Sequence, residues 1–184
     1  MGDREDLIAL HAEMRAAYWE RKDLGEVVRL ATEGIERGSA SDDTKAIAKA
    51  FAYDLGSFTW PGWDEPGIAI SPTELAAGLR AAERNLALAL ELDRSDDKVA
   101  MAHWLMGAQQ LASGDRDGAV ASFEQAQRFA ARAADPGQEH IARGFAALAR
   151  RDAAGIADAK AALAALEDGA GYVEQLETAG KVLG

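Results

Sequence analysis

The chain lacks cysteine altogether and contains four prolines among its 184 residues. The absence of cysteine excludes disulfides, thiolate catalysis and cysteine-ligated zinc. Valine, isoleucine and threonine are scarce, whereas alanine, leucine and glutamate are common, and this composition favours helices over strands. No apolar run approaches the roughly 18 residues that a transmembrane helix requires, and the first residues, MGDREDLIAL, do not have the pattern of a signal peptide. We therefore expect a soluble, cytoplasmic, helical protein.

Positive charge is also in short supply. Lysine and arginine number 20 against 31 aspartates and glutamates, which gives a formal net charge of −11. Such a chain repels the phosphates of nucleic acids and the anionic surface of membranes, and its basic residues are scattered among acidic ones. We therefore expect neither nucleic acid nor a membrane as a partner. The length and an ordinary hydrophobic content of 48% suit one domain over residues 1–184.

Apolar residues recur with a helical period along nearly the whole chain, with turn signals between the segments. Ser71 to Glu74 combines an N-cap serine, a proline and a capping-box glutamate, and Asp135 to Gln138 repeats that arrangement. Gly38 and Gly114 stand where helices should stop. The pattern predicts helices over residues 4–20, 23–37, 43–59, 72–92, 97–113, 116–133, 137–150, 152–167 and 170–182.

The stretch over residues 89–126, ALELDRSDDKVAMAHWLMGAQQLASGDRDGAVASFEQA, has the pattern of one hairpin's end followed by a complete second hairpin. Small residues, including Gly107 and Ala119, stand where two antiparallel helices must approach closely. The pairing of Met106-Gly107 with Ala119-x-x-x-Phe123 resembles the tetratricopeptide repeat (TPR). The signature of that family joins a Leu-Gly step in helix A to Ala-x-x-x-Phe in helix B.

The resemblance covers most of the chain. It implies an all-α fold, a right-handed solenoid of antiparallel helical hairpins with about four TPR-like repeats and a C-terminal capping helix. In the first repeat Arg15 replaces the small residue of helix A, which predicts a wider helix spacing there. The implied repeats span residues 4–40, 41–96 with a loop insert over 60–71, 97–134 and 135–168, and the capping helix spans 169–184.

The resemblance also implies a concave groove lined by side chains of the A helices. The basic set with which chaperone-binding members clamp a peptide's terminal carboxylate is absent. An apolar groove suits an apolar peptide or helix, although the loop insert could instead fill it. The groove positions that match include Ala12, Ala16, Trp19, Tyr53, Ser57, Trp60, Met101, Trp104, Ala108, Leu111, Ile141, Phe145 and Leu148.

The loop insert carries the most individual sequence of the chain, TWPGWDEPGIAIS. Its prolines and glycines exclude a regular helix, and tryptophans are costly to leave in water. Three interpretations follow. The insert folds back on its own chain and plugs the groove, it contacts a ligand or partner through Trp60, Trp63, Asp64 and Glu65, or it packs between subunits.

Residues with catalytic or metal-binding chemistry do not form a convincing set. His11, His103 and His140 share one register of helix A, where stacked hairpins would hold them too far apart for one metal ion. Asp115-x-Asp117-Gly118 lacks the distal glutamate of a calcium loop, and acids at helix starts are explained by capping. We expect no enzyme, no cofactor and no metal.

The sequence therefore predicts a protein-interaction adaptor or scaffold that binds a protein or peptide through the apolar groove and the tryptophan loop. Two alternatives stay open: a module that forms a homodimer through the tryptophan loop, and a small-ligand pocket under the insert. The candidate binding residues are Trp19, Tyr53, Trp60, Trp63, Asp64, Glu65, Trp104 and Phe145.

Overall fold

The computed structural model describes residues 2–184, which form nine α-helices, one 3-10 turn and no β-strand. This confirms the prediction of an all-α chain for the described residues. The largest boundary difference is at the end of α8, predicted at residue 167 and observed at Ala164. The elements are α1 (Gly2–Trp19), α2 (Leu24–Gly38), α3 (Lys45–Phe58), η1 (Pro61–Trp63), α4 (Pro72–Glu91), α5 (Asp96–Ala112), α6 (Arg116–Arg132), α7 (Pro136–Arg150), α8 (Ala153–Ala164) and α9 (Ala170–Leu183).

The helix starts carry the predicted capping chemistry. The Glu74 amide donates to Ser71 Oγ at 3.3 Å, and the Ser71 amide donates to the Glu74 carboxylate at 2.7 Å, which completes a capping box at α4. Asp135 caps α7 by accepting from the Gln138 amide at 2.9 Å. The Gln138 side chain, however, donates to the Asp135 carboxylate and does not reach back to the N-cap backbone. Asp115 caps α6 in the same way, so capping accounts for this carboxylate.

The chain divides into two compact units. The first comprises the residues up to Trp60 together with Glu65–Asp93, and the second comprises Pro61–Asp64 together with Arg94–Gly184. The predicted loop insert 60–71 is therefore shared between them. The prediction of one domain over 1–184 stays a prediction.

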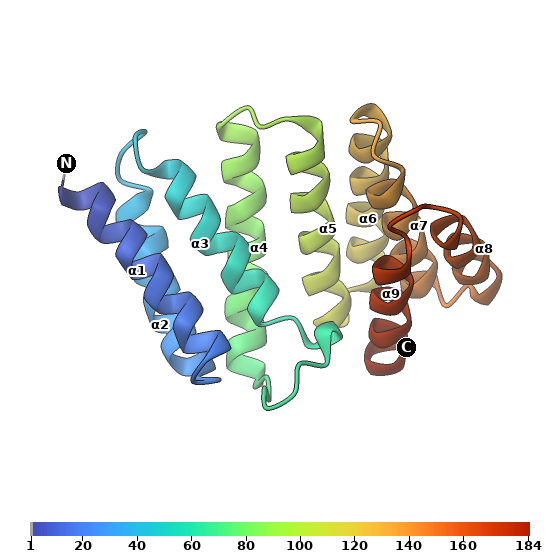
Figure 1. Ribbon diagram of the computed structural model, residues 1–184, viewed down its shortest axis with the longest axis horizontal. Helices are drawn as coiled ribbons and strands as arrows, with labels where there is room; N and C mark the ends of the chain where they lie inside the picture. Colours follow the sequence, from blue (N-terminus) through green and yellow to red (C-terminus); the bar gives the residue numbers. More distant parts are fainter. Residues whose placement is uncertain (1) are drawn as a thin grey trace. The chain divides into compact units, whose positions relative to one another are not determined.

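The first unit packs α1 to α4 in chain order, each helix against the next (Figure 1). Its core is built from side chains of all four helices, including Leu7, Val27 and Phe51. Gly34 of α2 lies so close to Phe51 that an added Cβ would meet the ring at 2.4 Å. Ile68 and Ile70 of the insert also pack against this core. The part of the insert that follows Asp64 thus belongs to the first unit.

The second unit packs α5 to α8 in chain order and sets α9 against α7 and α8 (Figure 1). A Cβ on Gly107 would meet the Phe123 ring at 2.9 Å, which confirms the predicted close approach of these two helices. Gly144 of α7 similarly lies against Leu176 of α9. The η1 turn packs against α9 and α5, so the tip of the insert belongs to this unit. No helix among the described residues is long and apolar enough to cross a membrane.

Candidate binding surfaces

The first candidate surface is an apolar strip on α1, which we define as Ile8, Ala12, Ala16 and Trp19. Steps of four, four and three residues place these side chains on one face of the helix. Ile8 is 53% exposed and Trp19 is 51% exposed. Ala12 is exposed and Ala16 is partly exposed. The strip contains the groove positions that the sequence predicts for the first repeat, and the structure leaves them open.

Trp19 is held in place by neighbouring rings. Tyr18 and Phe58 stack with centroids 3.9 Å apart, and Trp19 stands edge-to-face against both, at 4.8 Å from Tyr18 and 5.8 Å from Phe58. The Lys22 ammonium lies 5.6 Å from the centroids of Tyr18 and Trp19, within the range of cation–π attraction. The indole therefore has a fixed orientation and a large exposed area.

Lys22 also connects the rings of Tyr18 and Trp19 to the loop insert. Its ammonium pairs with the Glu65 carboxylate at 2.6 Å, and both side chains are about two-thirds buried. Burial and the nearby Glu65 carboxylate raise the pKa of the Tyr18 hydroxyl to about 12. Glu65, a predicted binding residue, thus lies in an internal ion pair of the first unit.

The α3 face beside the strip carries paired polar groups. Asp54 accepts from the Arg15 guanidinium at 3.0 Å, and His11 Nε2 lies 3.0 Å from the same carboxylate oxygen. Lys49 lies 5.9 Å from the ring of Tyr53, a predicted binding residue that is partly buried. Burial, and then the charge of Asp54, raise the pKa of Tyr53. Arg15, which the sequence places between paired helices, instead reaches from α1 to α3.

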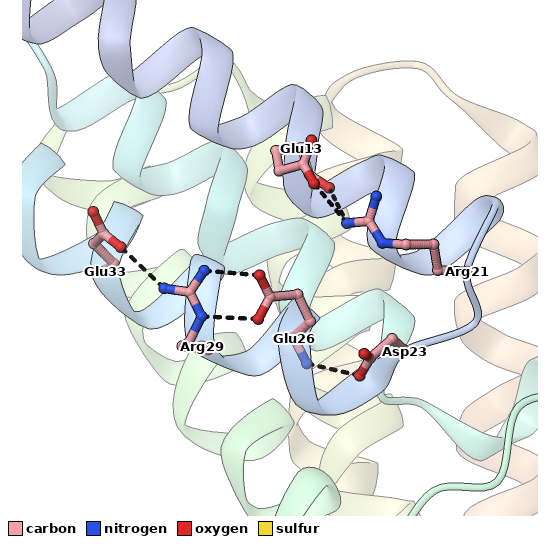
Figure 2. A network of polar contacts seen from close by, with 6 residues as sticks. All are labelled: Glu13, Arg21, Asp23, Glu26, Arg29 and Glu33. Carbon is pink, nitrogen blue, oxygen red and sulfur yellow. Dashed lines mark hydrogen bonds and ion pairs between the residues drawn. The ribbon is translucent and has the colours of Figure 1, made fainter.

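The outer surface of α1 and α2 carries a separate charge network (Figure 2). Arg21 donates to the Glu13 carboxylate at 2.7 Å. Arg29 binds both carboxylate oxygens of Glu26 at 2.8 Å and also reaches Glu33 at 3.5 Å. These exposed side chains pair with one another, and such surface ion pairs contribute little to stability. We therefore assign this network no binding role.

The second candidate surface lies in the second unit, at the end of an aromatic series. Trp63 and Trp104 have centroids 6.2 Å apart, Trp104 stands edge-to-face to Phe145 at 5.2 Å, and Phe145 lies 5.4 Å from Phe123. Phe123 and Phe145 are fully buried, whereas Trp63 is 38% exposed. The structure thus brings three predicted site residues together, but Phe145 forms part of the core.

Most predicted groove positions of this unit are buried as well. Ala108, Leu111, Ile141 and Leu148 lie in the core, as Phe145 does. Over α5 and α7 these apolar positions thus pack inside the unit and do not line an open groove, an alternative that the sequence left undecided. Together with the η1 contacts, this supports the interpretation that the insert folds back on its own chain.

A cleft lies between η1 and α9, with a volume of about 230 Å³. This is the predicted location of a pocket under the insert, although its volume falls below the roughly 300–1,000 Å³ of ordinary small-molecule sites. Its lining residues are Gly62, Trp63, Gly171, Glu174, Gln175 and Thr178.

The two remaining predicted residues differ in accessibility. Trp60 is 1% exposed and Asp64 is exposed, with a left-handed φ of 50° that aspartate tolerates better than most residues. Sequence reasoning missed Ile8, although its spacing of four residues from Ala12 was a usable signal. It also missed the α9 side of the cleft, since only tertiary packing brings Glu174 to Trp63.

No family model, curated protein or solved structure matches the chain. The α1 strip offers a fixed, exposed indole in an apolar row, and the cleft offers an indole beside a carboxylate.

Proposed function

We propose that this chain is a cytoplasmic, TPR-like solenoid of about four hairpin repeats that acts as an adaptor or scaffold. In this proposal the α1 strip binds an apolar segment of another protein, and the chain has no catalytic role. The sequential packing of neighbouring helices and the glycine contact at Gly107 support the repeat architecture. Exposure of Trp19 within the strip is the observation that carries the binding role.

The indole of Trp19 is the side chain of the strip with the most to contribute to binding. Tryptophan is among the residues that contribute most at protein interfaces, because it buries a large area while ordering few torsions. The contacts with Tyr18, Phe58 and Lys22 already restrict the ring, so binding loses little further side-chain entropy. A hot-spot tryptophan costs at least about 2 kcal/mol of binding free energy when it is truncated to alanine.

The shape of the strip favours one kind of partner. Ile8 and Trp19 are eleven residues apart on a single helix, which corresponds to about 16 Å. An amphipathic helix presents apolar side chains at intervals of three and four residues over the same length. We therefore expect the partner segment to be an amphipathic helix of about three turns.

The test uses the strip and a matched position elsewhere on the first unit. Leu90 of α4 is 56% exposed and lies outside the strip. Benzoylphenylalanine, a photo-crosslinking residue, replaces Ala12 in one variant and Leu90 in the other, and both are irradiated in cells. A partner crosslinked from position 12 and not from position 90 is then purified.

Binding of that partner is measured by calorimetry with Trp19→Ala and Leu90→Ala, after circular dichroism shows that both variants are folded. We expect Trp19→Ala to bind about 30-fold more weakly and Leu90→Ala to bind like the unmodified chain. Equal crosslinking from both positions, or equal affinity of the two alanine variants, would contradict the proposal.

Self-association through the tryptophan loop has less support. Trp60 is buried, the Trp63 ring lies against that of Trp104, and Glu65 is paired with Lys22. The loop therefore makes most of its contacts within its own chain. Sedimentation equilibrium distinguishes the adaptor from the homodimer. As a monomeric adaptor, the chain should have a mass of 19.5 kDa at all concentrations. A mass that rises to a dimer and falls again in Trp63→Ala would favour the loop-mediated homodimer.

A further inference from the structure

We propose that the cleft between η1 and α9 binds an organic ammonium group, with Trp63 contacting the cation through its ring and Glu174 supplying the counter-charge. This site belongs to the second unit and is independent of the α1 strip. The shared ligand chemistry is a primary or quaternary ammonium, carried by a lysine side chain of a polypeptide or by a small free amine.

The lining of the cleft comes from two short segments. Gly62 and Trp63 lie in η1, while Gly171, Glu174, Gln175 and Thr178 lie on α9. Positions 171, 174, 175 and 178 form one helical face. A Cβ placed on Gly171 would meet nothing within 4 Å, so this side of the cleft is open space.

The lining of the cleft carries negative charge. Glu174 contributes the single ionisable side chain of the lining, and among the described residues it forms no ion pair. Glu177, on the neighbouring face of α9, is instead paired with Lys160. An unpaired carboxylate beside a partly exposed indole attracts a cation and disfavours an anion.

The lining selects an organic cation over a metal ion. Calcium needs six to eight oxygen ligands and magnesium near-ideal octahedral geometry, whereas this cleft offers one carboxylate with one amide and one hydroxyl side chain. Tryptophan is the strongest aromatic partner for an ammonium group and acts within about 6 Å of the ring centroid. A volume of about 230 Å³ suits a group of side-chain size.

Both walls of the cleft are fixed before a ligand arrives. The Asp64 amide donates to the Pro61 carbonyl at 3.0 Å, which closes the turn that presents Trp63, and the Trp104 ring lies behind it. On α9, Leu176 and Ala179 are buried and hold the helix against its neighbours. A preformed site loses little free energy to ordering, and this favours binding even of a small group.

The experiment is a titration followed by the indole N–H signals of the four tryptophans in ¹H–¹⁵N NMR spectra. Trp63→Phe assigns the Trp63 signal by its disappearance. Tetramethylammonium chloride is the first probe, with sodium chloride at equal ionic strength as the reference. We expect a saturable shift of the Trp63 signal with tetramethylammonium and none with sodium, while the Trp19 signal stays in place.

Glu174→Gln and Glu177→Gln form a matched pair, because both remove one negative charge from α9 and only Glu174 lines the cleft. We expect Glu174→Gln to weaken the affinity for tetramethylammonium about two- to five-fold or more, and Glu177→Gln to leave it unchanged. Equal weakening by both variants, or no saturable shift of the Trp63 signal with any ammonium probe, would overturn the proposal.

Two further probes distinguish the sources of the ammonium group. A lysine-containing peptide is compared with its norleucine counterpart, and spermidine is compared with sodium chloride at equal ionic strength. Tighter binding of the lysine peptide than of spermidine assigns the site to a polypeptide partner, and the reverse order assigns it to a free amine. Binding of the norleucine peptide as tightly as the lysine peptide would contradict cation recognition.

Discussion

At the scale of single residues, the helix contacts of both units depend on positions that lack a side chain. Gly34 lies against the fully buried ring of Phe51, and Gly107 lies against the equally buried ring of Phe123. Neither ring can move without displacing its own neighbours, since protein interiors are close-packed. The glycines therefore set how near the paired helices approach.

A pair of glycine substitutions tests this argument. In Gly34→Ala the new methyl group would lie 2.4 Å from Phe51, and we expect a loss of about 1–3 kcal/mol in the free energy of unfolding from overpacking. In Gly171→Ala the methyl group enters open space, and we expect a gain of about 0.4–1 kcal/mol in the free energy of unfolding. Urea unfolding measures both values. Similar losses in the two variants would show that helix geometry, and not the Phe51 contact, is responsible.

Of these two glycine contacts, the sequence predicted the one at Gly107 and not the one at Gly34. The spacing of Met106-Gly107 and Ala119-x-x-x-Phe123 identified the contact between α5 and α6, because both halves of the signature occur within one hairpin. Gly34 gave no such signal, since its partner Phe51 lies on α3 and the register between α2 and α3 cannot be obtained from a local pattern. The pairing of Arg15 with Asp54 was missed for the same reason.

At the scale of the elements, the helix boundaries follow from local chemistry. Carboxylates and hydroxyls at Asp23, Ser71, Asp115, Asp135 and Asp152 accept hydrogen bonds from the first turns of their helices. These interactions involve residues three apart, so the sequence alone could predict them. The packing of η1 against α9 joins segments far apart in the chain, and no local signal predicts it.

Two serines at N-cap positions provide a test at this scale. Ser71 caps α4 through its side chain, whereas Ser95 precedes α5 without a side-chain bond to the helix backbone. We expect Ser71→Ala to lower the free energy of unfolding by about 1 kcal/mol. The corresponding change for Ser95→Ala should be smaller, because its hydroxyl donates to the exposed Asp97 carboxylate and does not cap the helix backbone. Thermal and urea unfolding give both values, and a larger loss for Ser95→Ala would refute the capping argument.

At the scale of the whole molecule, stability should decline in alkaline solution. The folded chain holds the Tyr18 hydroxyl at a pKa of about 12, above the ordinary value of 10.0. The unfolded chain releases this proton first, so the stabilisation is complete below pH 10 and is lost as the pH rises toward 12. We expect a fall on the order of 2 kcal/mol from this group over that window.

Urea unfolding between pH 9 and pH 12 measures the decline, with Tyr18→Phe as the comparison. Burial also raises the pKa values of Tyr53 and Tyr172, so part of the decline should persist in the variant. The free energy of unfolding should fall further for the unmodified chain than for Tyr18→Phe over this window, because only the unmodified chain loses the Tyr18 contribution. Curves that decline in parallel would exclude Tyr18 as a source.

The division of the insert has a consequence for how such a gene could be cut or recombined. The chain passes from one unit to the other at Trp60–Pro61, returns at Asp64–Glu65, and passes over again at Asp93–Arg94. A single breakpoint after Asp93 would therefore not yield two intact halves. The downstream product would lack Pro61–Asp64, which includes the η1 turn that packs on α9 and α5, and the upstream product would keep those residues without their partners. A recombination event that transfers the second unit intact would have to move Pro61–Asp64 and Arg94–Gly184 together.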